Sequence, residues 1–521
     1  YSTLKLFESF DINIGTSAVP AYQDAAFKLN FRIKKGNISL FGIGGKSNIH
    51  IKVSEFTESQ EDLYSDTDRD QYFETAMGIG GISYSHYFNS STYGKLILAA
   101  SGNQSLAYHE LVYRNPETFV IDSLVPNLGY LFNEDKYSAV YFINKKVNAS
   151  HSFKTGIHFD NYQFSYHDST LNLFTREFFT RLNFNGDASL IQPYFQWKYR
   201  IDRLTATAGL HTQYFTLNEN SKTIEPRFGL RYELNEKNAL SFGAGLHSQM
   251  QPTYIYFNQT ELSDGSVILH NKDLGFTRSA QIVLGWDYFL SRNIRIKTET
   301  YYQYLYDVPV EVEPSAFSVI NQGTGFSRFF PDELVNEGTG TNYGLELTIE
   351  KFFSRKYFFL ITGSLFDSKY KGSDGIERDT DFNSNYAANI MGGKEFRISK
   401  RSVLSLGTKI TYAGGRLYSP ADPVASALAN ELITIDTLTN TLRFDDYFRV
   451  DLKISWKLNA EKVTHEIALD LVNIFNKRNV LGLSYTPDTF NPKAEPIRRE
   501  YQLGFLPLFY YRIEFGIKRT N

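Results

Sequence analysis

Apolar and polar residues alternate along this chain with a period of two, in segments of about ten residues or more. In 448–458 every even position is apolar, from Phe448 to Leu458, and every odd position is polar or charged. Successive side chains of a β-strand point to opposite faces, so such a segment has one apolar and one polar face. Segments 195–201, 294–306 and 511–518 divide in a similar way. The sequence therefore predicts an all-β protein.

Strand length and the sorting of the connections favour a membrane barrel over a soluble sandwich. Soluble strands are usually about 5–6 residues long, whereas a tilted membrane strand needs about 9–11. We predict 20 strands, from 2–9 through 463–487 to about 500–518. Tight turns alternate with long polar connections, which is typical of a transmembrane antiparallel β-barrel. The predicted long connections are 52–73, 107–133, 167–185, 251–276, 310–340, 371–383 and 417–443.

Composition excludes several classes of function. The chain has no cysteine, which removes disulfide frameworks and thiolate metal sites. Its net charge of -3 gives no basic face for nucleic acid. No stretch has the roughly 18–20 uncharged apolar residues of a membrane helix. Aromatic residues near the tight turns predict a girdle at the membrane interface, with core packing as the alternative for each ring: Trp197, Tyr199, Trp286, Tyr288 and Trp456.

Motifs spread in order from about residue 20 to 515 resemble those of a known family. Segment 467–476, with its Asn-Ile-Phe-Asn ending, is similar to the penultimate strand of TonB-dependent receptors. Segments similar to the Bacteroidetes members of that family are 41–45, 301–310, 336–346, 392–396 and 446–451. The resemblance implies a 22-stranded barrel in the outer membrane of a Gram-negative bacterium, filled by a plug domain. We therefore expect 1–521 to be the barrel domain of a longer receptor, without the plug and the first two strands.

The resemblance also implies a function. Receptors of this family import a scarce nutrient, with energy transmitted by the TonB complex of the inner membrane. Siderophore, glycan, vitamin and peptide all stay open as substrates. The expected partners are outer-membrane lipid and lipopolysaccharide, the plug and TonB, and a surface lipoprotein or other outer-membrane subunits. The alternative hypothesis is a structural or assembly barrel in a multiprotein outer-membrane complex.

Two groups of residues are candidates for ligand or plug contacts. In connection 251–276, the rings of Tyr254, Tyr256 and Phe257 offer flat surfaces for stacking on a ligand, although packing between loops is at least as good an explanation. Charged residues on the polar faces of two strands are expected in the lumen, where pairing across strands or plug contact is favoured over ligand binding: Arg295, Lys297, Glu299, Arg449, Asp451 and Lys453.

Residues 55–74 form an acidic segment with a weak calcium signal. Asp66, Asp68 and Asp70 have the spacing that begins a calcium loop, but Gln71 and Met77 replace the glycine and glutamate of that pattern. A solvated acidic loop is favoured, and a calcium site stays open. We predict no other cofactor. No catalytic combination of side chains stands out, so an enzyme is not expected.

Overall fold

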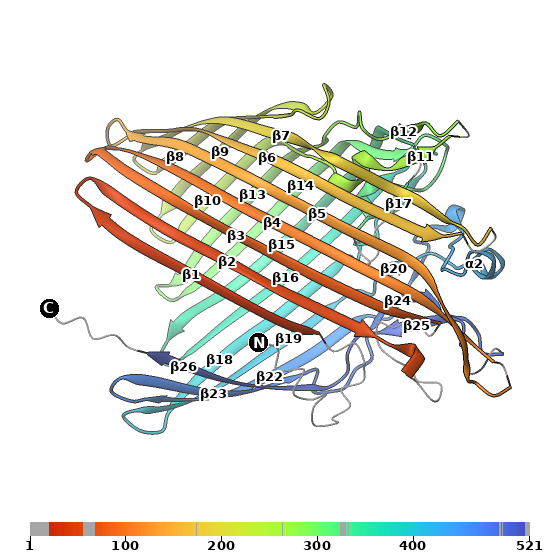
Figure 1. The fold of residues 1–521 in the computed structure, drawn as a ribbon. Coiled ribbons are helices and arrows are strands. Elements are labelled where there is room, and N and C mark those ends of the chain that lie inside the picture. Colours follow the sequence, from red (N-terminus) through yellow and green to blue (C-terminus); the bar gives the residue numbers. More distant parts are fainter. Residues whose placement is uncertain are drawn as a thin grey trace.

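In the computed structural model an antiparallel sheet of 20 strands curves into the wall of a barrel (Figure 1). The all-β prediction is confirmed. Each strand of the wall pairs with its neighbours in the chain, as β1 with β2 and β2 with β3. The structure describes residues 20–55, 68–115, 117–172, 175–262, 264–323, 330–331, 333–488, 491 and 493–515.

The wall consists of nineteen long strands and the three-residue β17 (Glu377–Asp379). The long strands are β1 (Ala21–Ile33), β2 (Gly36–Ile51), β3 (Arg69–Asn89), β4 (Thr92–Arg114), β5 (Ile121–Lys146), β6 (His151–Leu171), β7 (Phe178–Ile201), β8 (Leu204–Phe215), β9 (Lys222–Asn235), β10 (Asn238–Gln249), β13 (Thr277–Ser291), β14 (Ile294–Glu311), β15 (Leu334–Ser354), β16 (Tyr357–Lys371), β18 (Tyr386–Arg397), β19 (Ser402–Ala413), β22 (Tyr447–Asn459), β23 (Val463–Val472) and β26 (Leu506–Phe515).

The two ends of the barrel differ in their connections. At one end, called the tight-turn end, two to four residues join each pair of strands, as Lys34 and Lys35 join β1 to β2. At the other, the loop end, connections of six residues or more carry the remaining short elements. These are η1 (Val53–Glu55), η2 (Thr253–Phe257), β11 (Gln259–Glu261), β12 (Val267–Leu269), η3 (Val319–Asn321), β20 (Leu417–Tyr418), α2 (Pro423–Ala429), η4 (Asp436–Leu438), β21 (Leu442–Arg443), β24 (Val480–Tyr485) and β25 (Ile497–Tyr501). No helix in the described ranges is long and apolar enough to cross a membrane.

The edges of the sheet constrain how the wall can close. Within the described residues β1 pairs with β2 and β26 pairs with β23, and neither has a second partner strand. Both strands run from the loop end to the tight-turn end, so direct pairing between them would be parallel. An antiparallel wall therefore closes through an odd number of further strands. Segment 2–9, predicted as a strand, lies outside the described residues. Together with the two strands that the family resemblance implies, it would make three, and this count stays a prediction.

Several predicted connections were too long. Segments 107–133 and 167–185 are mostly strand, because the β4–β5 and β6–β7 hairpins continue to turns at 115–120 and 172–177. β5 alone has 26 residues, more than twice the length needed to cross a bilayer. Beyond the lipid neither face of a hairpin must be apolar, so the alternation used to find strands no longer applies there.

The predicted strand 463–487 was also wrong in its extent. β23 ends at Val472, and Asn473 and Asn476 then take left-handed backbone conformations with φ of 52° and 50°. Asparagine tolerates this region better than most residues, because its short side chain bonds locally. Here the Asn473 side chain donates to the Lys477 carbonyl at 3.0 Å. The following residues form β24, which pairs with β25 outside the wall.

The aromatic residues predicted for the interface lie close to the tight-turn end. Trp286 and Tyr288 stack with ring centroids 5.6 Å apart, and the Trp456 indole nitrogen donates to Ser402 Oγ at 2.6 Å. Trp286 and Trp456 stay 39% and 42% exposed on the outward face. An indole that keeps its apolar body outside while its N–H is bonded suits a membrane interface.

The two faces of the wall predict opposite responses to a charge. Leu284 lies near the middle of β13 on the outward face, whereas Gln281 is on the inward face of the same strand. We expect Leu284→Arg to lower the free energy of unfolding in lipid vesicles by about 2–4 kcal/mol, because it places a cation in hydrocarbon. The matched variant Gln281→Arg should cost less than about 1 kcal/mol. Denaturant unfolding followed by tryptophan fluorescence measures both. Equal costs would contradict the assigned sidedness.

Candidate functional site

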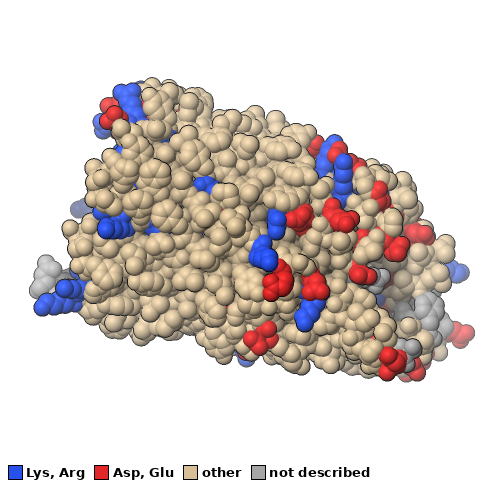
Figure 2. Space-filling view, turned by 90° about the horizontal axis from the view of Figure 1, so that it is seen from above, with Lys and Arg blue, Asp and Glu red and all other residues tan. Residues whose placement is uncertain are grey.

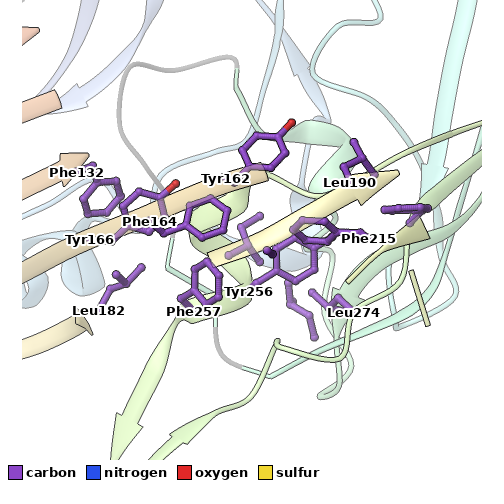
Figure 3. Close-up of a cluster of buried hydrophobic side chains, with 14 residues drawn as sticks. Phe132, Tyr162, Phe164, Tyr166, Leu182, Leu190, Phe215, Tyr256, Phe257 and Leu274 are labelled. Carbon is purple, nitrogen blue, oxygen red and sulfur yellow. The ribbon is translucent and has the colours of Figure 1, made fainter. Parts of the chain in front are cut away.

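Connection 250–276 is packed onto the wall by a cluster of buried side chains at the loop end (Figure 3). Its 3-10 helix η2 supplies Ile255, Tyr256 and Phe257, which are all completely buried. The rings of Phe184 and Phe257 stack, with centroids 3.7 Å apart and planes inclined by 8°. The cluster comprises Phe132, Tyr162, Phe164, Tyr166, Leu182, Ala188, Leu190, Phe215, Ile255, Tyr256, Phe257, Leu274, Phe276 and Leu334.

The alternation along β6 places this cluster on the lumen side of the wall. Ile157 and Phe159 are exposed on the outward face, at 41% and 38%. Tyr162, Phe164 and Tyr166 have the opposite parity and are buried beneath η2. Side chains two residues apart share a face of a strand, so η2 covers the inward face. Connection 250–276 therefore turns into the mouth of the barrel instead of extending away from it.

Hydrogen bonds hold the polar atoms of this cluster. Glu134 on β5 accepts from the Tyr166 hydroxyl at 2.6 Å and from the Thr253 hydroxyl at 2.9 Å. The Tyr256 hydroxyl accepts from the Gln251 backbone N–H at 3.1 Å, and burial raises the pKa of Tyr256 to about 12. Buried polar groups with partners cost little, whereas unpartnered ones would destabilise the packing. The connection is thus fixed by both apolar and polar contacts.

The three loop aromatics predicted as ligand contacts occupy different environments. Tyr256 and Phe257 are completely buried, and their ring faces pack on other side chains of the cluster. Tyr254 is only partly buried and lies 6.2 Å from the Phe330 ring, measured between centroids. The packing alternative therefore describes the position of Tyr256 and Phe257. A ligand-binding role stays a prediction, with Tyr254 the most accessible of the three.

The predicted lumen charges are paired with nearby carboxylates. Arg295 donates two hydrogen bonds to Asp287 on the neighbouring strand, at 2.9 and 2.5 Å. Lys453 lies 3.3 Å from Asp470 on β23. The other two pairs join residues two apart on one strand, Lys297 with Glu299 and Arg449 with Asp451. All six residues are paired, but only Arg295 and Lys453 pair with a neighbouring strand, as the sequence analysis predicted. Plug contact and ligand binding stay predictions.

A second charged cluster on the inward face was missed by sequence reasoning. Glu225 on β9 is 1% exposed and accepts from Arg227 at 2.5 Å and from Gln213 at 2.7 Å. The Glu225 carboxylate also lies 2.9 Å from His211 Nδ1 and accepts a hydrogen bond from the hydroxyl of Ser248. Thr223, Glu225 and Arg227 alternate on β9, as do His211 and Gln213 on β8. The period of two could have predicted that these residues share one face of their strands. It could not have predicted that residues of β8, β9 and β10 meet.

A small recess opens on the inward face between β13, β14 and β15. Its volume is about 230 Å³. Most of its lining surface is apolar, and the side chains of two glutamines and two glutamates supply its polar groups. The lining residues are Gln281, Val283, Glu299, Tyr301, Tyr302, Gln303 and Glu346.

The acidic residues of the possible calcium site have protein partners where they are described. Asp70 accepts from the backbone N–H and the hydroxyl of Ser54, at 2.8 and 2.6 Å. Asp68 binds Arg69 at 2.7 Å and accepts from Asn430 at 3.0 Å. Asp66 lies outside the described residues. Within the described ranges no three metal-binding side chains converge. Calcium binding stays a prediction.

Segment 446–451 and the asparagines that follow β23 form a polar network at the loop end. Asp446 accepts from the hydroxyls of Tyr386 and Tyr412, both at 2.7 Å, and these donors hold the pKa of Asp446 below its usual range. Asn479 pairs with the backbone of Phe448 in both directions, at 3.0 Å each. These contacts fasten the connections after β19 and β23 to the rim. The residues that carried the family resemblance therefore have structural roles here.

Comparison with known proteins agrees with this architecture. The family model described as "TonB dependent receptor-like, beta-barrel" matches residues 21–476. The chain belongs to this family. It is a family of receptors rather than enzymes. Among curated proteins none matches the sequence.

Solved structures share the fold of this receptor barrel at low sequence identity. The ferric-catecholate import receptor Fiu of E. coli K12 has a TM-score of 0.67 and 11% identity, over 96% of this chain and 75% of that one. FyuA, the ferric yersiniabactin uptake receptor of Yersinia pestis, scores 0.64 at 12% identity, over 95% and 71%. The siderophore receptor PiuA of Acinetobacter baumannii scores 0.61 at 11% identity, over 96% and 76%. The barrel prediction is thereby confirmed.

Removing the Phe257 ring should release connection 250–276 without unfolding the barrel. We expect Phe257→Ala to cost about 3–5 kcal/mol locally, because it leaves a cavity between Phe164 and Phe184. Leu262→Ala, in the same connection but 41% exposed, is the matched control. Hydrogen exchange of residues 250–276 measures the release. Unchanged protection in Phe257→Ala would show that the cluster does not hold this connection.

The Glu225 cluster gives a second stability prediction. Glu225→Gln removes the charge that Arg227 and His211 face, and we expect a loss of about 2–3 kcal/mol in unfolding free energy. Glu219→Gln changes a carboxylate that is 83% exposed and should be neutral within about 0.5 kcal/mol. Denaturant unfolding in vesicles compares the two. If both variants match the wild type, the cluster contributes nothing to the wall.

Proposed function

We propose that this chain is the barrel of an outer-membrane receptor that takes up a scarce nutrient with energy from the TonB complex. A ligand would be captured between the connections of the loop end and would pass through the polar lumen. A plug domain inside the barrel would block the lumen until the TonB complex displaces it. Membership of the receptor family supports the class of function, and the finer steps are proposals.

The inward-turned connection 250–276 is the observation that carries the proposal. A barrel with a purely structural role has no need to place a loop on its lumen wall. Here the packing of η2 narrows the mouth and leaves the Tyr254 ring partly accessible beside it. Binding residues commonly lie on loops that a rigid scaffold positions. The recess beside Glu299 and Glu346 lies on the inward face below.

Ferric siderophores are the first substrate class to test. Three proteins with the same fold are named as a ferric-catecholate import receptor, a siderophore receptor and a ferric yersiniabactin uptake receptor. Aromatic rings and hydrogen-bonding groups at the mouth suit a chelate with polar and apolar parts. Glycans, vitamins and peptides complete the panel. The proposed location is the outer membrane of a Gram-negative bacterium.

Uptake by cells that lack the gene tests this function directly. We expect deletion to lower the uptake of one labelled nutrient at limiting concentration, because the unaided flux of a scarce solute is small. Complementation with the intact gene should restore uptake, and dissipating the proton-motive force should abolish it. Normal uptake of the whole panel, together with loss of an outer-membrane complex, would support the assembly-subunit hypothesis instead.

The mouth can be tested in the same assay. Tyr254→Ala should raise the half-saturating concentration of the nutrient about tenfold, the effect of losing one stacking contact of about 1.4 kcal/mol. Leu262→Ala is again the control. An unchanged concentration dependence would remove Tyr254 from the site while leaving the uptake function standing.

A further inference from the structure

Exposed lysines and arginines are concentrated at the tight-turn end of the barrel. Seven of the nine tight turns contain at least one, and Lys145 and Lys146 directly precede an eighth. All of these side chains are in exposed residues. Those within the turns are Lys34, Lys35, Arg203, Lys237, Arg292, Arg355, Lys356, Lys400, Arg401 and Lys462.

Acidic partners do not neutralise these cations. Within the described residues only Arg401 of this set forms an ion pair, with Glu461 at 3.2 Å. Arg203 donates instead to the carbonyl oxygen of Leu234. Asp202, Glu236 and Glu461 are the only acidic residues in these turns. The tight-turn end therefore has a net positive charge.

The opposite charge is found at the loop end. Figure 2 shows Lys and Arg at the left, where the tight turns lie, and a preponderance of Asp and Glu at the right, with a largely uncharged surface between them. A surface that needed only solubility would have both signs interspersed. The sorting by sign indicates that the two ends meet different surroundings.

The position of the cations relative to the predicted membrane interface indicates what surrounds the tight-turn end. Large apolar side chains stand exposed directly beside the turns, as in Phe88, Phe353 and Phe358 at 51%, 55% and 36%. Trp286 and Trp456 lie six and four positions before their turns, at the predicted interface. Residues just beyond an aromatic girdle lie among lipid headgroups.

We propose that the basic residues of the tight turns form a ring that binds the anionic headgroups of phospholipids in the adjacent leaflet. Lysine and arginine near a membrane surface attract anionic lipid additively, and the flexible side chains reach headgroups that diffuse laterally. The ring would enrich anionic phospholipid around this end of the barrel. It would also fix the vertical position of the barrel in the membrane.

The three tryptophans of the chain make the proposal measurable. Trp197, Trp286 and Trp456 are the only three, and each lies within six positions of a tight turn. The complete chain is reconstituted in vesicles of phosphatidylcholine and phosphatidylglycerol at seven to three. Either lipid carries brominated chains, which quench nearby tryptophan. Soluble phosphate cannot produce this signal, because only a membrane lipid delivers the bromine.

At low salt we expect brominated phosphatidylglycerol to quench about twofold more per mole than brominated phosphatidylcholine. The ratio should fall toward one in about 0.5 M NaCl, where exposed charges are screened. This comparison of the two lipids uses the unmodified chain, so its result does not depend on whether a substitution perturbs folding.

Two variants with equal charge change locate the effect. Quintuple substitution to glutamine at the tight-turn end should bring the ratio to one: Lys34, Lys35, Lys237, Arg292 and Lys462. The matched control at the loop end should keep the wild-type ratio: Lys222, Lys272, Lys371, Lys477 and Lys493. Equal quenching by the two lipids in the wild type at low salt would overturn the proposal. So would an equal loss of the ratio in both quintuple variants.

Discussion

Backbone hydrogen bonding in lipid is the constraint on which the rest of this structure depends. No water is available there to pair with an N–H or C=O group, so the strands must pair with one another and the sheet must curve toward closure. Every long strand except β1 and β26 has a partner on both sides within the described residues. The same requirement constrains the number of strands in the wall. The edge strands β1 and β26 run in the same direction, so an antiparallel wall closes only through an odd number of further strands.

Alternation along each strand then divides the wall into two chemical environments. Outward positions keep large apolar side chains exposed, such as Leu284 and Tyr302. Inward positions collect charges that neutralise one another, around Asp287 on β13 and Glu225 on β9. At the loop end the inward face changes character and binds the aromatic side of η2. One wall thus meets lipid outside, polar pairs in the lumen, and a packed protein core at its mouth.

The sequence predicted the wall better than the mouth, for a physical reason. Lipid imposes period two on strands such as β14 and β22, and that period is visible without any structure. Beyond the lipid the requirement ends, so the upper parts of β4 to β7 were mistaken for loops. Tyr256 and Phe257 looked like exposed loop aromatics because burial there depends on Phe164, Phe184 and Phe215, which are distant in sequence. The end of β23 was missed because Asn473 alters the backbone direction without changing the apolar pattern.

The sidedness of a single strand tests this account most directly. The chain has no native cysteine, so single cysteines introduced along β14 report without background. A small charged thiol reagent, applied to the chain reconstituted in vesicles, should label cysteines at the inward positions Glu299, Tyr301 and Gln303. It should spare cysteines at the outward positions Thr298, Thr300 and Tyr302, which hydrocarbon covers. Labelling that does not alternate along the strand would contradict a barrel wall between lipid and a polar lumen.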